Sequence, residues 1–178
     1  EGGAKQEVKS QSPADGGTAR AGGAHATSSG PAVGTRSSAQ LKGDADDAFR
    51  NGQLKRACTL YGKALQADSA AEWMQDAAVG GLHFRCQCLA NRAACRLKMR
   101  EYPLCIDDAS AALAALSASA ETNASSLSLK LLARRGMAYC QMQKYEEARD
   151  DYARAVAMDP ANEQLAHDLR MIEAQLGS

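Results

Sequence analysis

Large apolar and small residues recur along this chain at helical spacing, and the recurrence is densest in residues 129–162, LKLLARRGMAYCQMQKYEEARDDYARAVAMDPAN. Small residues at Gly136 and Ala148 allow two antiparallel helices to approach closely. Gln143–Lys144 supplies a short turn, and Pro160 ends the second helix because proline lacks the N–H that continues it. The pattern therefore predicts a helix–turn–helix unit. Its aromatic and remaining small positions are Tyr139, Tyr145, Tyr152 and Ala155.

The same order of positions occurs twice more. In residues 38–71 Gly52 falls at the turn. In residues 86–119 Tyr102 opens the second helix, and Pro103 lies in its first turn, where the missing N–H leaves no helical hydrogen bond unmade. These matches predict three helix pairs stacked into an all-α array. The small positions of these two units are Ala45, Ala57, Ala64, Ala93, Cys105, Ala109 and Ala112.

Two longer connections and a final helix complete this pattern. The stretch before residue 86 is too long for a tight turn, and we expect an extended second helix or an insertion, broken at Gly80–Gly81. A polar insertion precedes the third unit. After it, residues 161–177 are predicted to form an amphipathic helix that covers the exposed end of the array. Its apolar face carries Leu165, Leu169, Ile172 and Leu176.

Residues 1–37 have a different composition. Eight of the 15 glycines fall in the first 40 residues, among serine, alanine and threonine, and large apolar residues are almost absent. Burial could not offset the entropy lost on ordering such a segment, so we predict a disordered linker followed by a folded domain at 38–178. Because the chain begins at Glu1, we expect it to be part of a longer protein.

Charge and hydropathy exclude several classes of partner. The formal net charge is zero, with 21 basic and 21 acidic residues, so there is no electrostatic basis for binding nucleic acid or an anionic membrane. The sequence contains no apolar run long enough to span a bilayer and no signal-peptide pattern at its start. We therefore expect a protein partner.

The sequence offers no set of residues suited to catalysis or metal binding. Cys86 and Cys88 point to different faces of a predicted helix, and the six cysteines are expected to be reduced core residues. Adjacent acids such as Asp107–Asp108 also diverge on a helix, and the run Arg149–Asp150–Asp151 is expected on a solvated outer face. We predict that the chain is not an enzyme and binds no cofactor or metal.

The three units resemble tetratricopeptide repeats (TPRs), and the resemblance implies a helical solenoid whose first helices line a concave groove. In TPR co-chaperones of three repeats, five groove positions form a carboxylate clamp for the acidic C-terminal tail of Hsp90 or Hsp70. The family pattern is Lys, Asn, Asn, Lys and Arg, and four of the five match here. Two pairs are four residues apart, so each pair shares a helix face. The corresponding positions are Lys42, Asp46, Asn91, Lys130 and Arg134.

Asp46 departs from the family pattern. An amide at this position can donate to a ligand carboxylate, whereas an ionised Asp46 repels it. At about 4 Å the repulsion is about 1 kcal/mol in water and about 4 kcal/mol at an effective dielectric constant near 20. Alternatively, Asp46 pairs with Lys42 and partly neutralises the clamp. Both interpretations predict that the clamp binds its peptide more weakly or prefers a different peptide.

A narrower resemblance lies in residues 89–113 and 130–160, LANRAACRLKMREYPLCIDDASAAL and KLLARRGMAYCQMQKYEEARDDYARAVAMDP. They are similar to the C-terminal TPRs of the axonemal dynein assembly factors, the dyslexia-susceptibility candidate family, whose members also carry an N-terminal CS domain. The resemblance implies a cytoplasmic and ciliary adaptor that acts with Hsp90 and Hsp70, with dynein chains and other assembly factors as clients. The alternative is a scaffold that holds an internal peptide or helix of another assembly factor without using the clamp.

Overall fold

The computed structural model describes residues 36–71, 80–118 and 124–177, and within these ranges the chain forms seven α-helices and no strand. The all-α prediction is confirmed. The linker predicted at 1–37 lies outside the described residues except for Arg36 and Ser37, and Ser37 caps the first helix through a hydrogen bond from the Gln40 amide. The helices are α1 (Ser38–Arg50), α2 (Leu54–Ala71), α3 (Gly80–Lys98), α4 (Tyr102–Ser117), α5 (Ala124–Gln141), α6 (Tyr145–Met158) and α7 (Glu163–Leu176).

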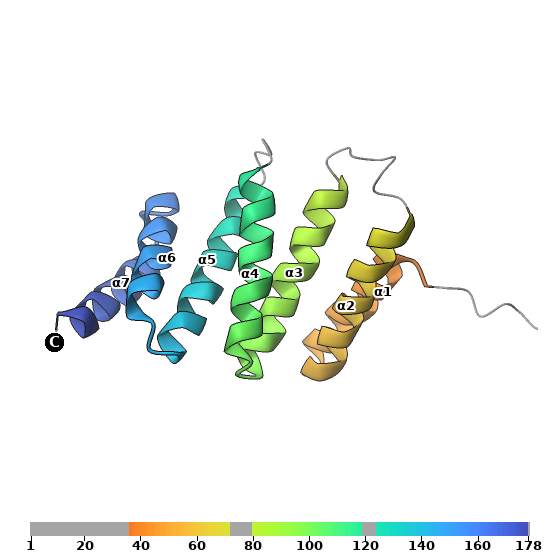
Figure 1. Cartoon of the computed structure of the whole chain (residues 1–178), viewed down its shortest axis with the longest axis horizontal. Coiled ribbons are helices and arrows are strands. Elements are labelled where there is room, and N and C mark those ends of the chain that lie inside the picture. Colours follow the sequence, from red (N-terminus) through yellow and green to blue (C-terminus); the bar gives the residue numbers. More distant parts are fainter. Residues whose placement is uncertain (1–35, 72–79, 119–123, 178) are drawn as a thin grey trace, which may run out of the picture. The chain divides into compact units, whose positions relative to one another are not determined.

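Each helix packs against its neighbours in sequence (Figure 1). The pairs α1–α2, α3–α4 and α5–α6 form the three helical hairpins, and α7 packs on α6. The first helices of the hairpins also meet, α1 with α3 and α3 with α5, so these three helices share one side of the array. None of the described helices is long and apolar enough to cross a membrane.

The three hairpin turns have the same backbone conformation. Gly52, Arg100 and Gln143 lie at equivalent positions, with positive φ angles of 72°, 63° and 60°. In each turn the N–H of this residue donates to the carbonyl three residues back, and the next N–H donates to the carbonyl five residues back. These bonds satisfy carbonyls at the end of the first helix. The sequence marks this conformation with glycine only in the first turn.

The small residues predicted at helix contacts are buried. The close approach is tightest at Gly136, where an added Cβ would lie 2.8 Å from two ring carbons of Tyr152. The glycine therefore brings α5 against α6 and leaves the tyrosine ring at 3% exposure. The predicted small residues with no exposed surface are Ala45, Ala57, Ala64, Ala93, Cys105, Ala109, Ala112, Ala148 and Ala155.

Two aspartates, Asp108 and Asp151, are buried with arginine partners. The solvated face predicted for residues 149–151 is therefore wrong for Asp151, whereas Arg149 and Asp150 are exposed. Asp151 accepts two hydrogen bonds from Arg135, both of 2.7 Å, and its side chain is 4% exposed. Asp108 makes the equivalent bidentate pair with Arg92. The hydrogen bonds that both arginines donate to the buried aspartates raise the pKa of their guanidinium groups. These charge-assisted bonds link the two helices of a hairpin.

Two first helices begin earlier than the repeat pattern indicates. α3 starts at Gly80, not near Cys86, and α5 starts at Ala124, not near residue 129. Gly80 and Gly81, expected to form a break, are the first two residues of α3. α2 extends to Ala71, and residues 72–79 lie outside the described residues. The added turns remain helical because apolar residues in them, Leu82 and Leu127, pack against the core.

The last helix covers the end of the array with three of its four predicted apolar residues. Asn162 caps α7 by accepting a hydrogen bond from the Leu165 amide. Leu165 and Ile172 are buried and Leu169 packs against the same cluster, but Leu176 is 38% exposed. The prediction is therefore wrong for Leu176, which lies in the final turn of α7 and is not part of the core cluster.

Candidate functional site

A polar cavity of about 390 Å³ lies on the side of the array formed by the first helices. α1 contributes Lys42, α3 contributes Asn91, and α5 contributes Lys130 and Arg134. Residues from three helices far apart in sequence thus converge on one cavity, and they include four of the five site residues predicted from the sequence. The remaining lining residues are His83, Gln87, Ser126 and Leu127.

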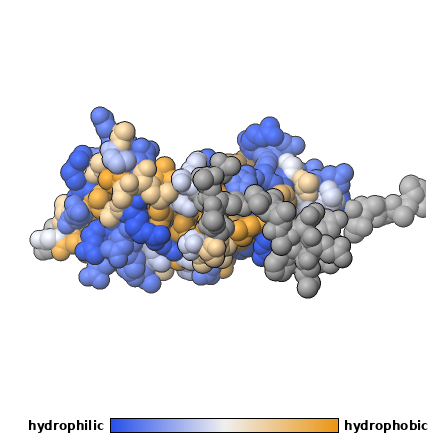
Figure 2. Space-filling view, turned by 90° about the horizontal axis from the view of Figure 1, so that it is seen from above, coloured by the Kyte–Doolittle hydropathy of each residue, from blue (hydrophilic) through white to orange (hydrophobic). Residues whose placement is uncertain are grey.

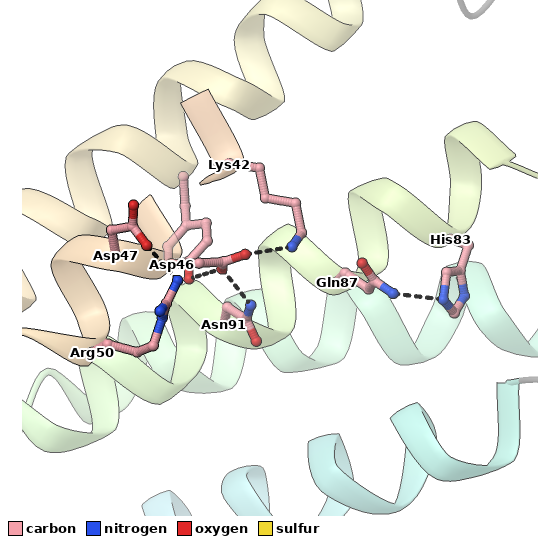
Figure 3. Close-up of polar contacts among 8 residues, drawn as sticks. Lys42, Asp46, Asp47, Arg50, His83, Gln87 and Asn91 are labelled. Atoms are coloured by element: carbon pink, nitrogen blue, oxygen red, sulfur yellow. Dashed lines mark hydrogen bonds and ion pairs between the residues drawn. The ribbon is translucent and has the colours of Figure 1, made fainter. Parts of the chain in front are cut away.

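The fifth predicted residue, Asp46, is held by three donors of the protein itself (Figure 3). Lys42 Nζ lies 2.7 Å from its Oδ2, and Asn91 Nδ2 donates to Oδ1 across 3.1 Å. The hydroxyl of Tyr61 also donates to Oδ1. Partial burial disfavours the charged form, but these bonds outweigh it and lower the pKa of Asp46. Asp46 is therefore ionised at neutral pH and engages two of the predicted clamp residues.

Tyr61 is a part of this network that the sequence did not indicate. It fits the pattern of a core aromatic on α2 and is 1% exposed. Burial, together with the Asp46 carboxylate, raises the pKa of its hydroxyl, which therefore stays protonated and donates. Fifteen residues separate the two partners, and only the packing of α2 on α1 brings them together.

Arg134 lies in the cavity without an acidic partner among the described residues. Its Nη1 donates to the Ala90 carbonyl across 2.7 Å, and burial lowers the pKa of its guanidinium. The adjacent Arg135 faces the other way and is neutralised by Asp151. Lys130, one helical turn before Arg134, is exposed and likewise makes no ion pair in the described part of the chain. The α5 side of the cavity therefore carries two uncompensated positive charges.

The early turns of α3 form the other rim of the cavity. His83 Nε2 and Gln87 Nε2 lie 2.7 Å apart (Figure 3). Sequence reasoning missed both residues. His83 precedes the repeat predicted to start near Cys86, in a stretch expected to be an extended second helix or an insertion, and Gln87 lies in that repeat but is not one of the five groove positions of the family pattern. The described residues hold no cluster of three or more His, Cys, Asp or Glu side chains suited to a metal ion.

Comparisons with known proteins agree on the fold. Residues 129–162 match the tetratricopeptide repeat family. Over 82 residues, 46% of this chain, the sequence is 40% identical to Dynein axonemal assembly factor 4 of Rattus norvegicus, but it spans only 19% of that protein. Over 123 residues, 67% of the chain, it is 32% identical to the Mitochondrial import receptor subunit TOM34 of Homo sapiens and spans 34% of it.

A solved structure extends the similarity to most of the chain. The first TPR of Spaghetti (RPAP3), bound to the HSP90 peptide SRMEEVD, superposes with a TM-score of 0.62 at 26% identity, over 84% of this chain and 100% of that one. This likeness extends over far more of the chain than the family match, which covers only residues 129–162. The described part of this chain is therefore a tetratricopeptide-repeat domain.

Proposed function

We propose that this domain is an adaptor that binds the acidic C-terminal tail of Hsp90 or Hsp70 in the cavity between α1, α3 and α5. The observation that carries the proposal is Arg134, a partly buried cation that donates to the Ala90 carbonyl and has no carboxylate within the described residues. Taking a charge out of water is costly unless an opposite charge compensates it. A ligand carboxylate supplies that compensation.

The contrast with Arg135 strengthens this argument. Two successive arginines lie on one helix, and one is paired with the buried Asp151 while the other points into the cavity. Arg135 has a structural role, because it links α5 to α6 and also donates to Ser110 on α4. Arg134 also links two helices, through its bond to the Ala90 carbonyl on α3, but no carboxylate among the described residues neutralises its charge beside Lys130. Two cations one turn apart suit a ligand that carries one or more carboxylates.

The comparisons support the same class of ligand. The RPAP3 structure holds the HSP90 peptide SRMEEVD, whose last residues provide three acidic side chains and a terminal carboxylate. The dynein part of the proposal rests on the similarity to Dynein axonemal assembly factor 4. We infer that the adaptor supports dynein-arm preassembly in the cytoplasm, with the cilium as a second location and dynein chains and assembly factors as clients. The role is one of binding, not catalysis.

Calorimetric titration of the chain with SRMEEVD tests the proposal. We expect micromolar affinity, about −8 kcal/mol, and no binding of the analogue SRMQQVN, in which amides replace the three acidic side chains. Arg134→Ala is expected to weaken binding about tenfold or more at unchanged helix content. Arg149→Ala is the control, since it removes a positive charge on α6 that does not line the cavity. Equal affinity in both variants would overturn the proposal, and a loss of helix content in Arg134→Ala would mean that this arginine is structural.

The second candidate function is a scaffold for an internal acidic peptide or helix of another assembly factor. Asp46 favours it, because this carboxylate already takes the donors of Lys42 and Asn91 that a free C-terminus would use. An amidated SRMEEVD peptide separates the two candidates. Loss of binding on amidation supports the tail, and unchanged binding supports an internal segment.

Asp46→Asn should increase the preference for a free over an amidated C-terminus, because it removes the competing charge and releases Lys42. Asp47→Asn is the matched control, since Asp47 pairs with Arg50 outside the network (Figure 3). Equal preference in both variants would show that Asp46 does not govern recognition of the C-terminus.

A further inference from the structure

We infer that the domain has a second protein-binding surface, at its first two hairpin turns, which fits an acidic segment of a partner protein that carries an apolar side chain. This turn surface comprises residues 52–56 and 98–100, and it contains a cavity of about 640 Å³. The inference goes beyond the proposed function, because it holds whether or not the groove binds a chaperone tail.

The cavity joins the first hairpin to the second. The hairpin turns lie along one edge of the array (Figure 1). Five consecutive lining residues come from the α1–α2 turn and the start of α2, and the sixth directly follows α3. The packing of α2 on α3 therefore creates the cavity. Its lining is Gly52, Gln53, Leu54, Lys55, Arg56 and Met99.

Two half-buried apolar side chains, Leu54 and Met99, give the cavity its apolar surface. Met99 packs against the core cluster of the first hairpin, and its flexible thioether adapts to different apolar ligands. Apolar surface alone does not single out this cavity, because it is also visible at the α6–α7 end of the array (Figure 2). The charge around the cavity distinguishes it.

Four exposed cations belong to the turn surface, and none of them has a carboxylate partner among the described residues. Lys55 and Arg56 line the cavity, and Arg56 Nη1 donates to the amide oxygen of Gln53 across 3.0 Å. Lys98 and Arg100 flank Met99. The Lys98 ammonium lies 5.7 Å from the ring centroid of Phe49, a cation–π contact that leaves its charge uncompensated.

This positive charge is a property of two turns and not of the repeat. Residues 47–56 and 95–104 each contain three basic residues and one acidic residue, whereas the equivalent residues 138–147 contain one basic and two acidic. The acid of the first turn, Asp47, is paired with Arg50. The third turn thus offers a comparison within the same domain.

The combination of charge and apolar surface favours a peptide over a nucleic acid. Phosphates pair with the same cations, but single-stranded nucleic acids also need aromatic side chains on which their bases stack. The described lining of the cavity contains no aromatic residue. Acidic residues that flank an apolar side chain match the four cations and the apolar pair Leu54 and Met99 together.

The turn surface lies far enough from the groove for both to be occupied at once. Met99 follows Asn91 by eight residues, and Gly52 follows Lys42 by ten. At about 1.5 Å per residue along a helix, these separations are about 12 and 15 Å. An adaptor with this arrangement holds two partners on one domain.

Calorimetric titration of the full chain with the peptide EEDLFEDEE tests the inference. The peptide is acetylated and amidated, so it presents no terminal carboxylate to the groove. We expect a dissociation constant of about 10–100 μM. EEDSSEDEE should bind about tenfold more weakly, because it lacks the apolar side chains. QQNLFQNQQ, which lacks the charges, should not bind.

Protein variants then assign the binding to the turn surface. The double variant Lys55→Glu, Arg56→Glu should weaken EEDLFEDEE about tenfold or more and leave SRMEEVD within about twofold. Acidic residues suit the first turn of α2, so this variant is expected to fold. Lys144→Glu is the matched control, since it reverses a charge at the third hairpin turn, outside the cavity. Arg134→Ala should leave EEDLFEDEE unchanged.

Each outcome supports or overturns the turn surface separately from the groove. A loss in the double variant that is absent from Lys144→Glu and from Arg134→Ala supports it. It is overturned if EEDLFEDEE fails to bind at about 1 mM, if Lys144→Glu weakens it equally, or if SRMEEVD displaces it from the groove. Equal affinity for EEDLFEDEE and EEDSSEDEE would also overturn it. Tighter binding of a single-stranded RNA, lost in the double variant, would replace the peptide by a nucleic acid.

Discussion

The contact between Gly136 and Tyr152 gives a direct test of how closely α5 and α6 pack. A Cβ at position 136 would lie 2.8 Å from the Cδ2 and Cε2 atoms of Tyr152 and 3.4 Å from the Cβ of Asp151. Favourable carbon–carbon contacts lie at about 3.5–4.0 Å. The tyrosine is 3% exposed and packs within the hydrophobic core cluster. Gly136→Ala therefore requires a shift of the ring or of the helix.

Two opposing terms determine the free energy of unfolding of this variant. Replacing glycine by alanine inside a helix stabilises by about 0.8–1.0 kcal/mol. Overpacking a well-filled contact costs about 1–3 kcal/mol. Gly136→Ala should therefore destabilise by about 0–2 kcal/mol, and Gly136→Leu by more. Gly43→Ala isolates the first term, because nothing lies within 4 Å of a Cβ at that position in α1.

Urea denaturation followed by far-UV circular dichroism measures both variants. Gly43→Ala should raise the midpoint and Gly136→Ala should lower it relative to Gly43→Ala, with the slope unchanged. The difference between the two variants, about 1–3 kcal/mol, is the overpacking term itself. If Gly136→Ala were as stable as Gly43→Ala, the close approach of α5 and α6 would be wrong, and so would the repeat register based on it.

Three further substitutions test other features of the fold by the same measurement. Asp151→Ala should lower the free energy of unfolding by about 3–5 kcal/mol, because it leaves the buried Arg135 without its carboxylate partner. Asp150→Ala, at an exposed position, should lower it by about 0–1 kcal/mol, and similar losses in the two variants would contradict the buried pair. Ile172→Ala should lower the free energy of unfolding by about 2–5 kcal/mol, whereas Leu176→Ala should change it by no more than about 0.5 kcal/mol. The reverse order would mean that α7 packs through another face. Gly52→Ala should destabilise by about 1–2 kcal/mol through its positive φ alone, since the space around it is open; an unchanged midpoint would refute that backbone conformation.

The helical hairpins could be predicted from the sequence because their signals are local. Small residues at Gly136 and Ala148 recur at fixed spacing, and the chain must bury them against a helix that follows within a few residues. The turns at Arg100 and Gln143 adopt the same left-handed conformation as Gly52 without its sequence signal. The backbone hydrogen bonds at the helix end impose that conformation on residues that do not favour it.

The two buried ion pairs could have been predicted from the sequence, but they were not. Arg92 and Asp108 are 16 residues apart, as are Arg135 and Asp151, so the same pair recurs in two repeats. That recurrence is a signal for a structural role. Single acids in charged runs carry no such signal, because their exposure depends on which side of the helix the partner helix covers.

The sequence by itself determined the three hairpins and the small residues between them. Through its resemblance to the TPR family, it also indicated five candidate binding positions in the groove. Lys42 and Asp46 could be paired from their spacing of four, because one helix turn brings them together. The tertiary structure alone decided that Tyr61 and Asn91 also bind Asp46, and that Arg134 has no carboxylate in the described part of the chain. It also brought residues of α5 and α7 together around one small cavity. Such contacts join residues on different helices, and their geometry follows from how the hairpins stack, which no local pattern encodes.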